Sequence, residues 1–203
     1  MKRAIAITTA LMLFVWSTGY AATVSFGPVT TSATVDGALS LSVVLRENSS
    51  TGVTMPSIRF GALGNIGTGT LRSNTTTGVG SVVAMITVNS HGLQYTVTQT
   101  GTTMSTGGTT PKTLPAGACV VTPAYAAADN GGAGLPTGAS VGAGGSFVST
   151  GRILYISETA GSLRTIQAHY SITDDPAAGS TAGVPLDQAG GTYAGTVTIT
   201  TTA

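Results

Sequence analysis

Charged residues are scarce in this chain of 203 residues, because only 7% are Asp, Glu, Lys or Arg, against about a quarter in a typical soluble protein. Eight basic and seven acidic residues leave a formal net charge of +1. Long-range attraction of nucleic acids or acidic ligands needs summed charge, which this chain lacks. The sequence therefore predicts no nucleic-acid partner. It also predicts weak repulsion between copies, which suits a subunit that packs against itself.

Cysteine is nearly absent as well. Cys119 is the one cysteine in the sequence, so no disulfide can form within the chain. Its neighbours are Val120 and Val121. We therefore expect the thiol to be a small buried side chain.

No apolar run is long enough to cross a membrane as a helix, but residues 1–21 are organised like a secretory signal peptide. Lys2 and Arg3 precede a short apolar run, residues 4–16, and Gly19 and Ala21 suit a cleavage site. Cleavage after Ala21 leaves 182 residues with a net charge of −1, since Lys2 and Arg3 are lost. We expect a secreted protein of the extracellular cell surface. An uncleaved membrane anchor is the alternative.

Local motifs of enzymes and metal sites are also lacking. The sequence contains no P-loop, no dinucleotide-binding glycine pattern, and no HExxH, CxxC or EF-hand spacing. His91 falls in a turn signal and His169 on the polar side of a strand, without a nucleophile motif nearby. Residues 129–130 and 174–175 offer oxygen atoms to calcium, but Asp and Asn are equally typical of turns. The sequence predicts no catalytic residue, cofactor, metal ion or small-molecule substrate, and hence no enzyme.

The pattern that is present is alternation of apolar with Thr or Ser residues, which is typical of β-strands. Residues 33–45 alternate over their whole length, with a bend expected at Asp36-Gly37. Residues 81–89 and 93–97 flank a turn signal and are predicted to pair as a hairpin. Further strands are expected at 58–63, 118–125, 152–157, 163–172 and the end of the chain. About eight strands without helices predict an antiparallel β-sandwich.

Residues 101–151 are dominated by Gly, Thr, Ala and Pro. They read as long surface loops with one short strand between them. A linker between two domains is the other reading, but neither flank has the pattern of a complete fold. We therefore interpret residues 31–203 as one domain whose long loops provide a binding or assembly surface.

The last residues of the chain read as a strand, since Tyr193, Val197 and Ile199 alternate with small or hydroxylated residues. Two stretches, IRFGAL at 58–63 and GGTYAGTVTIT at 190–200, resemble secreted pilus subunits of the chaperone–usher type, including the spore-coat-U-like domains. They are similar to the early Phe-Gly strand and the final Gly-Thr-Tyr-x-Gly strand of such subunits. Many spore-coat-U-like domains carry a cysteine pair, which this sequence lacks.

The resemblance implies an immunoglobulin-like sandwich that lacks one strand until the leading segment of another copy supplies it. Residues 22–30 are then the donor segment, and Pro28 interrupts its pairing. The alternative is that residues 22–35 form the first strand of the protein's own sheet. The resemblance implies three anchor residues in the donor segment, Val24, Phe26 and Val29. It also implies that the strand lining the acceptor groove contains Tyr193, Val197 and Ile199.

The function implied by this resemblance is that of a pilus or fimbria subunit, which forms a homopolymer by donor-strand exchange. A periplasmic chaperone and an outer-membrane usher are the further partners implied. The alternative is a monomeric secreted or surface adhesin that binds carbohydrate or another surface through the loops of 101–151. Sugars stack on exposed aromatic rings, and Tyr125 is the only aromatic residue of these loops before Phe147. This argues mildly against the adhesin.

Overall fold

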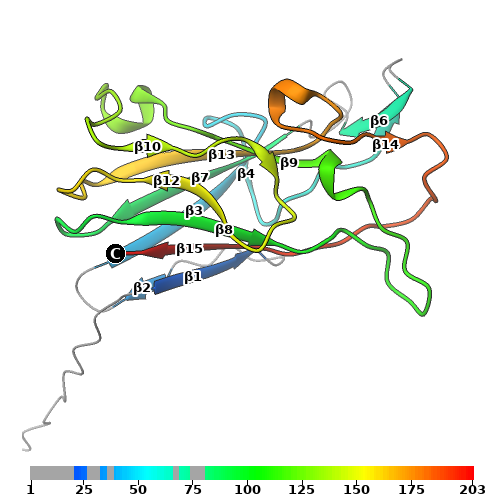
Figure 1. Ribbon diagram of the computed structural model, residues 1–203, viewed down its shortest axis with the longest axis horizontal. Helices are drawn as coiled ribbons and strands as arrows, with labels where there is room; N and C mark the ends of the chain where they lie inside the picture. Colours follow the sequence, from blue (N-terminus) through cyan, green and yellow to red (C-terminus); the bar gives the residue numbers. More distant parts are fainter. Residues whose placement is uncertain (1–20, 27–32, 36–38, 66–68, 74–80) are drawn as a thin grey trace, which may run out of the picture.

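The computed structural model describes residues 21–26, 33–35, 39–65, 69–73 and 81–203, to which the structural statements below refer. These residues form antiparallel sheets and no α-helix, which confirms the all-β prediction. Two larger sheets form a sandwich, and a small third sheet lies at one end of it (Figure 1). Apart from Ala21, the predicted signal peptide lies outside the described residues. Within these ranges, no helix has the length and apolarity that a membrane span needs.

The first sheet, sheet A, has five strands in the order β1-β15-β8-β12-β10. All its neighbours are antiparallel. Its strands are β1 (Ala21–Phe26), β8 (Thr96–Gly101), β10 (Ser140–Val141), β12 (Arg152–Ile156) and β15 (Val197–Thr202). The first and the last described strands of the chain therefore lie side by side.

The second sheet, sheet B, has the order β11-β9-β13-β7-β3-β2, and β4 pairs with the far end of β3. Its strands are β2 (Ala33–Val35), β3 (Leu39–Glu47), β4 (Thr54–Met55), β7 (Val82–Asn89), β9 (Cys119–Ala124), β11 (Gly145–Ser146) and β13 (Arg164–Ile172). Sheet C consists of β5 (Leu63–Asn65), β6 (Thr70–Ser73) and β14 (Val184–Pro185). Three 3-10 helices are also described, η1 (Ala116–Ala118), η2 (Ala127–Asn130) and η3 (Pro176–Ala178).

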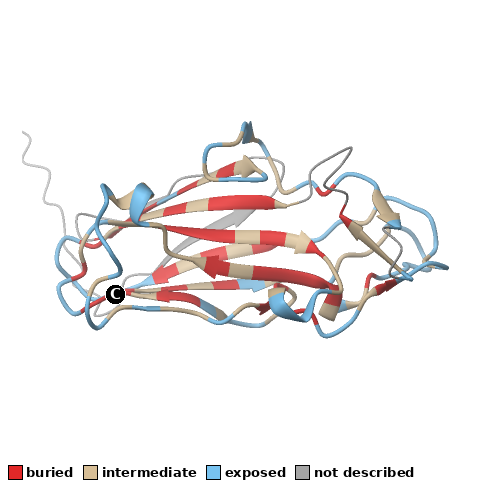
Figure 2. Cartoon of the chain, turned by 90° about the horizontal axis from the view of Figure 1, so that it is seen from above, coloured by how far each residue is buried: buried red, intermediate tan, exposed pale blue. Residues whose placement is uncertain are grey.

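Alternation along the strands builds the core between sheets A and B. In β3, Leu39, Leu41, Val43 and Leu45 are buried while the residues between them are more exposed, as the banding of the strands in Figure 2 shows. Successive side chains of a strand point to opposite faces, so one face of β3 supplies the core. Each such side chain contributes about 1.5–3 kcal/mol when it is fully buried.

One buried polar chain of hydrogen bonds joins the two sheets. The Tyr170 hydroxyl of β13 donates to Oε1 of Gln99 in β8 at 2.7 Å. The Gln99 Nε2 atom donates in turn to the carbonyl oxygen of Phe147 at 2.8 Å. Both side chains are fully buried, so these bonds satisfy groups that would otherwise be costly to remove from water.

Two expectations about strands 33–45 and 58–63 are wrong. Residues 33–45 form two strands that pair antiparallel, with Ala33 opposite Leu41, instead of one bent strand. A period of two is the same in one long strand and in two paired ones, so the pattern alone does not separate them. In the second segment a strand begins only at Leu63. Residues 58–62 have no ladder partners, and Gly61 has a positive φ of 67°.

The predicted hairpin of 81–89 and 93–97 is also wrong, although both strands exist. β7 belongs to sheet B and β8 to sheet A, so residues 90–95 cross from one sheet to the other. Residues 157–163 cross in the opposite direction, from β12 in sheet A to β13 in sheet B. Both crossings lie where β15 ends and β3 begins. We call this side of the sandwich, formed by 90–95 and 157–163, the arch end.

Candidate strand-exchange site and apolar groove

The leading segment that was predicted as a donor lies against the predicted acceptor strand, within the same chain. β1 pairs antiparallel with β15 in an unbroken register, from Ala21 opposite Thr202 to Phe26 opposite Val197. β1 is the edge strand of sheet A, with β15 as its only ladder partner among the described strands (Figure 1). Of the two predicted arrangements, the structure therefore has the one in which the leading segment pairs with the protein's own sheet.

The hydrogen bonds of β15 divide between its two neighbours. The Thr102 N–H donates to the Thr196 carbonyl at 2.9 Å, so the even-numbered residues of β15 direct their backbone groups toward β8. The odd-numbered residues, among them Val197 and Ile199, direct theirs toward β1. Their side chains face the core and are almost fully buried.

Of the predicted acceptor residues, Val197 and Ile199 lie in β15, and Tyr193 lies in the loop before it. Of the predicted donor anchors, Val24 and Phe26 lie in β1 opposite Ile199 and Val197. Val29 lies outside the described residues.

Beyond Val197 the edge of sheet A continues without a described partner. The backbone of Gly195 forms no hydrogen bond to the described residues, although its neighbours Ala194 and Thr196 bond to the β8 side. Across from it, residues 58–62 likewise form no backbone hydrogen bond within the described part of the chain. These two segments line the same cavity, and their backbone donors and acceptors have no partner in the described part of the chain.

An apolar groove lies between these two segments. We define its inner part as the cavity of about 330 Å³ next to Val197 and Phe147. Its outer part is the cavity of about 600 Å³ next to Leu63 and Leu71. Both parts are lined by Ile58, Arg59, Phe60, Met104 and Tyr193. We call this side of the sandwich, opposite the arch end, the groove end.

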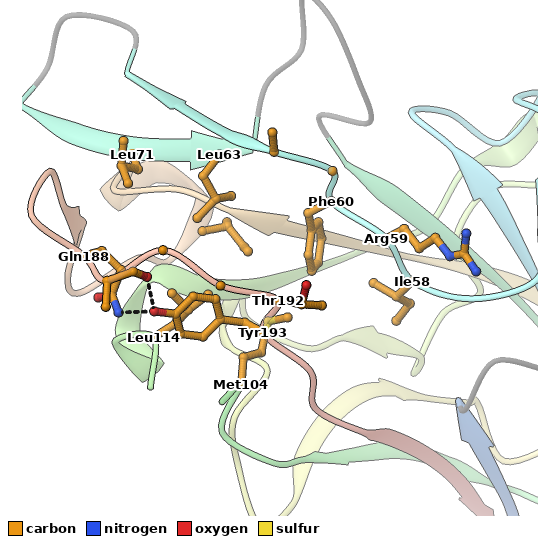
Figure 3. A pocket seen from close by; sticks show the side chains of 16 residues that line it. Ile58, Arg59, Phe60, Leu63, Leu71, Met104, Leu114, Gln188, Thr192 and Tyr193 are labelled. Carbon is orange, nitrogen blue, oxygen red and sulfur yellow. Dashed lines mark hydrogen bonds between the residues drawn. The ribbon is translucent and has the colours of Figure 1, made fainter. Parts of the chain in front are cut away.

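Aromatic rings stand on both sides of the groove (Figure 3). The Tyr193 hydroxyl donates to the Ala189 carbonyl at 2.6 Å and accepts from Gln188 Nε2 at 2.7 Å. Phe60 is 6% exposed and stacks on Phe147 with ring centroids 6.2 Å apart. The Arg59 guanidinium points away from the groove in Figure 3, and its Nε donates to the Ser57 hydroxyl at 3.0 Å. The groove therefore offers apolar and aromatic contacts, without a charge directed into it.

The two histidines occupy ordinary structural positions. His91 lies in the crossing 90–95 at the arch end and has a positive φ of 52°.

 The left-handed conformation of His91 is one that tight turns between strands accept. His169 Nε2 bonds to Gln167 Oε1 at 2.7 Å, and burial lowers the pKa of the His169 imidazole. Among the described residues, neither histidine hydrogen-bonds to a Ser, Thr or Cys side chain.

The acidic pairs that could have been calcium ligands have protein partners. Asp175 caps η3 by accepting from the Ala177 N–H at 2.9 Å. Asp174 forms an ion pair with Arg72 and accepts from the Thr70 hydroxyl at 2.5 Å. The Thr70 hydrogen bond and the Arg72 guanidinium lower the pKa of the Asp174 carboxyl. In the described residues, no three His, Cys, Asp or Glu side chains are grouped as a metal site would require.

The prediction for Cys119 is confirmed, because its side chain is completely buried. Burial raises the pKa of the thiol to about 12. The thiolate is the reactive form of cysteine, so this thiol is unreactive at neutral pH.

Sequence reasoning did not find the groove. Met104 and Leu114 belong to the Gly- and Thr-rich stretch that reads as loop, yet they line the outer part. An isolated apolar residue in such a stretch is the only signal that could have indicated it. The loop aromatic Tyr125 is not a free stacking surface for sugars, because it is half-buried and its hydroxyl donates to the carbonyls of Ala133 and Gly134 at 3.1 Å.

Comparison with protein families, curated proteins and solved structures found no match to this chain.

Proposed function

We propose that the protein is a structural subunit of an extracellular filament, a pilus or fimbria, in which copies are joined by exchange of the leading strand. The observation that carries this proposal is the position of β1, which is held at the edge of sheet A by β15 alone among the ladder partners. The same segment of another copy can form the same backbone bonds with β15. Exchange of an identical element is a low-cost route to assembly.

The free energy of the exchange is small because the bonds lost within one copy are remade between two. Apolar burial by β1 is exchanged in the same way, so only donor side chains that are not already buried within their own copy add to the free energy, by about 1.5–3 kcal/mol for each that becomes fully buried. Removal of the predicted signal peptide after Ala21 still leaves residues 22–26 to pair with β15. The six residues 27–32 then connect β1 to β2 and span at most about 25 Å when extended, which limits how far apart two joined copies lie.

The inner part of the groove supports a donated segment longer than β1. If the register of β1 and β15 continues, donor residue 28 lies opposite Gly195 and donor Val29 lies opposite Ala194. Pro28 has no N–H, so it accepts a hydrogen bond from Gly195 but cannot donate one. In this register the side chain of Val29 lies on the face opposite to that of Val24 and Phe26, so its predicted role as an anchor requires that Pro28 shift the phase of the segment.

The surface composition also suits assembly. Natural sheets protect their free edges with charged residues, lysine above all, whereas Lys112 is the only lysine after residue 21 and lies in a loop. In this proposal the protein is secreted, is kept soluble by a periplasmic chaperone and is delivered by an outer-membrane usher. Neither an enzyme activity nor a cofactor is part of the proposal.

Cross-linking between two differently labelled chains tests the exchange. Ser25 and Thr198 are opposite each other and form a non-hydrogen-bonded pair, in which Cα atoms are about 4.5 Å apart, within the range of a disulfide. Ser25→Cys and Thr198→Cys chains are purified separately, mixed and oxidised. Exchange predicts a disulfide between the two kinds of chain, whose fraction rises with protein concentration.

The matched control pairs Ser25→Cys with Thr51→Cys, an exposed residue of the turn between β3 and β4. This mixture should give little cross-linked product. The doubly substituted chain, Ser25→Cys with Thr198→Cys, reports pairing within one copy. If it closes its internal disulfide at every concentration while the mixture never cross-links, the protein is a closed monomer and the filament proposal fails.

A further inference from the structure

Two exposed leucines project from the arch end. Leu93 is 46% exposed and Leu163 is 57% exposed. Leu93 lies in the crossing 90–95 and Leu163 in the crossing 157–163, and we call these two side chains the leucine tip. Neighbouring large apolar side chains that are exposed to solvent often mark a surface that contacts another molecule.

The leucine tip stands on a rigid base. The buried Ser90 hydroxyl donates to the Gly161 carbonyl at 2.7 Å and ties one crossing to the other. The Tyr95 hydroxyl donates to the Ser162 carbonyl at 3.3 Å. Because these bonds hold both crossings, docking of the tip requires little loss of backbone entropy.

The outer part of the groove lies at the opposite end of the molecule and offers an apolar surface of the kind that leucine side chains contact. It is a hollow of about 600 Å³ whose walls include Leu63, Leu71 and Leu114. Leu186 lies in the loop that leads to the groove and is 51% exposed. Both ends therefore expose leucine.

Strand exchange would bring these two ends together. β1 runs from the arch end, where Ala21 is opposite Thr202, to Val197 at the groove end. A donated β1 therefore leaves the acceptor copy at its groove end. In the donor copy, β3 starts at the arch end, where Ser40 is opposite Asn89, so the chain that follows β1 leads back to the donor's arch end.

We infer that the leucine tip of the donor copy docks into the outer part of the groove of the acceptor copy. The inference rests on the proposed function, because strand exchange is what places the two ends in contact. The resulting contact is head-to-tail, and repetition of such a heterologous contact builds a filament. The strand then supplies the joint, and the tip fixes the angle between joined copies.

Charges at the two ends agree with this docking. Arg164 follows Leu163, and its Nη1 donates to the Leu163 carbonyl at 2.9 Å. Asp187 follows Leu186 and is exposed. In the described residues, the only ion pair is that of Arg72 and Asp174. The Arg164 charge helps to lower the pKa of the Glu158 carboxyl in its own copy, so Asp187 of a docked copy would share Arg164 with Glu158.

A second cross-linking experiment tests the docking. Leu163→Cys chains and Gly190→Cys chains are polymerised together and treated with a short bismaleimide. Gly190 lines the outer groove, and a Cβ placed there meets no atom within 4 Å. The control replaces Gly190→Cys by Gly134→Cys, which is equally open but away from the groove. Buried Cys119 stays unlabelled.

Docking predicts about fivefold or more cross-linked product with Gly190→Cys than with Gly134→Cys, since a seated tip raises the effective concentration of the pair. Equal yields from the two mixtures overturn the inference. The disulfide of the Ser25→Cys and Thr198→Cys mixture separates the possible failures. If that disulfide forms and the yields are equal, strand exchange stands without docking; if it does not form, the proposed function itself fails.

A double substitution gives an independent readout. Leu93→Ser with Leu163→Ser removes the apolar tip at exposed positions, so the fold should be retained. Docking predicts that polymerisation then needs about tenfold more protein, equivalent to about 1.4 kcal/mol, whereas the Ser25 to Thr198 disulfide still forms at high concentration. An unchanged concentration requirement contradicts the inference.

Discussion

At the arch end, two sheet-crossing connections hydrogen-bond to each other, whereas at the groove end two segments that line one cavity have backbone groups without a partner among the described residues. The Ser90 hydroxyl and the Gly161 carbonyl are bonded at 2.7 Å, and Tyr95 N–H donates to the Ser157 hydroxyl at 2.8 Å. By contrast, residues 58–62 and Gly195 form no backbone hydrogen bonds among the described residues. Both ends close the same sandwich, so the difference is one of local chemistry.

This difference indicates where another chain can be added. An end whose polar groups are already paired gains nothing from an incoming strand. An end with free donors and acceptors next to an apolar hollow gains hydrogen bonds and burial together. Substitutions at matched positions of the two ends should therefore have very different effects on stability.

Replacement of a glycine should give the largest contrast. A Cβ at Gly161, which has a φ of +54°, would overlap the carbonyl group of Leu93 and the Ser90 hydroxyl. Gly161→Ala should lower the free energy of unfolding by about 3 kcal/mol or more, since backbone must move and the left-handed conformation disfavours alanine. Gly190→Ala at the groove end should change it by less than about 0.5 kcal/mol. Urea unfolding of both variants measures the contrast, and similar losses would show that the two ends are equally loose.

A smaller contrast should come from single hydroxyl groups. Ser90→Ala removes the buried donor to the Gly161 carbonyl and should cost about 1–2 kcal/mol. Thr192→Ala removes an exposed hydroxyl from the wall of the groove and should cost less than about 0.5 kcal/mol. Thermal unfolding of the two variants compares them. Equal losses of stability would mean that the hydrogen bond between the two crossings does not stabilise the arch end.

The sequence allowed the fold class to be predicted, because alternation in segments such as β3 and β13 survives in the structure. It did not show which strands are neighbours. A pattern of period two specifies a buried face but not the sheet to which the strand belongs, so β7 and β8 were paired wrongly. The crossing of residues 90–95 depends on contacts with Gly161, about 70 residues further along the chain, as the bond from Ser90 shows.

The candidate site, like the fold, was predicted only in part from the sequence. The resemblance predicted that the leading segment pairs with the last strand between copies, whereas β1 lies beside β15 within one chain. The groove did not follow, because its lining comes from distant loops that contribute one or two residues each, such as Met104, Leu114 and Tyr193. Alternation gives no information about residues that lie outside strands.

The smallest expected effect concerns the response of the arch end to alkali. Burial, followed by the nearby Glu158 carboxylate, raises the pKa of the Tyr155 hydroxyl from its ordinary value of 10.0 to about 12. Tyr155 is fully buried and its ring lies 5.9 Å from that of Tyr95. Because the folded state keeps the hydroxyl neutral, its contribution to stability is complete below pH 10 and is lost as the pH rises toward 12.

Tyr155→Phe should therefore reduce the loss of stability between pH 10 and 12 while the ring packing at neutral pH is kept. Urea midpoints of the variant and the parent, measured at pH 8 and at intervals up to pH 12, give the two slopes. If the substitution leaves the slope of stability against pH unchanged, the Tyr155 hydroxyl has the same pKa in the folded and the unfolded chain. Water would then reach the arch end as freely as the groove end, and the contrast between the two ends would be lost.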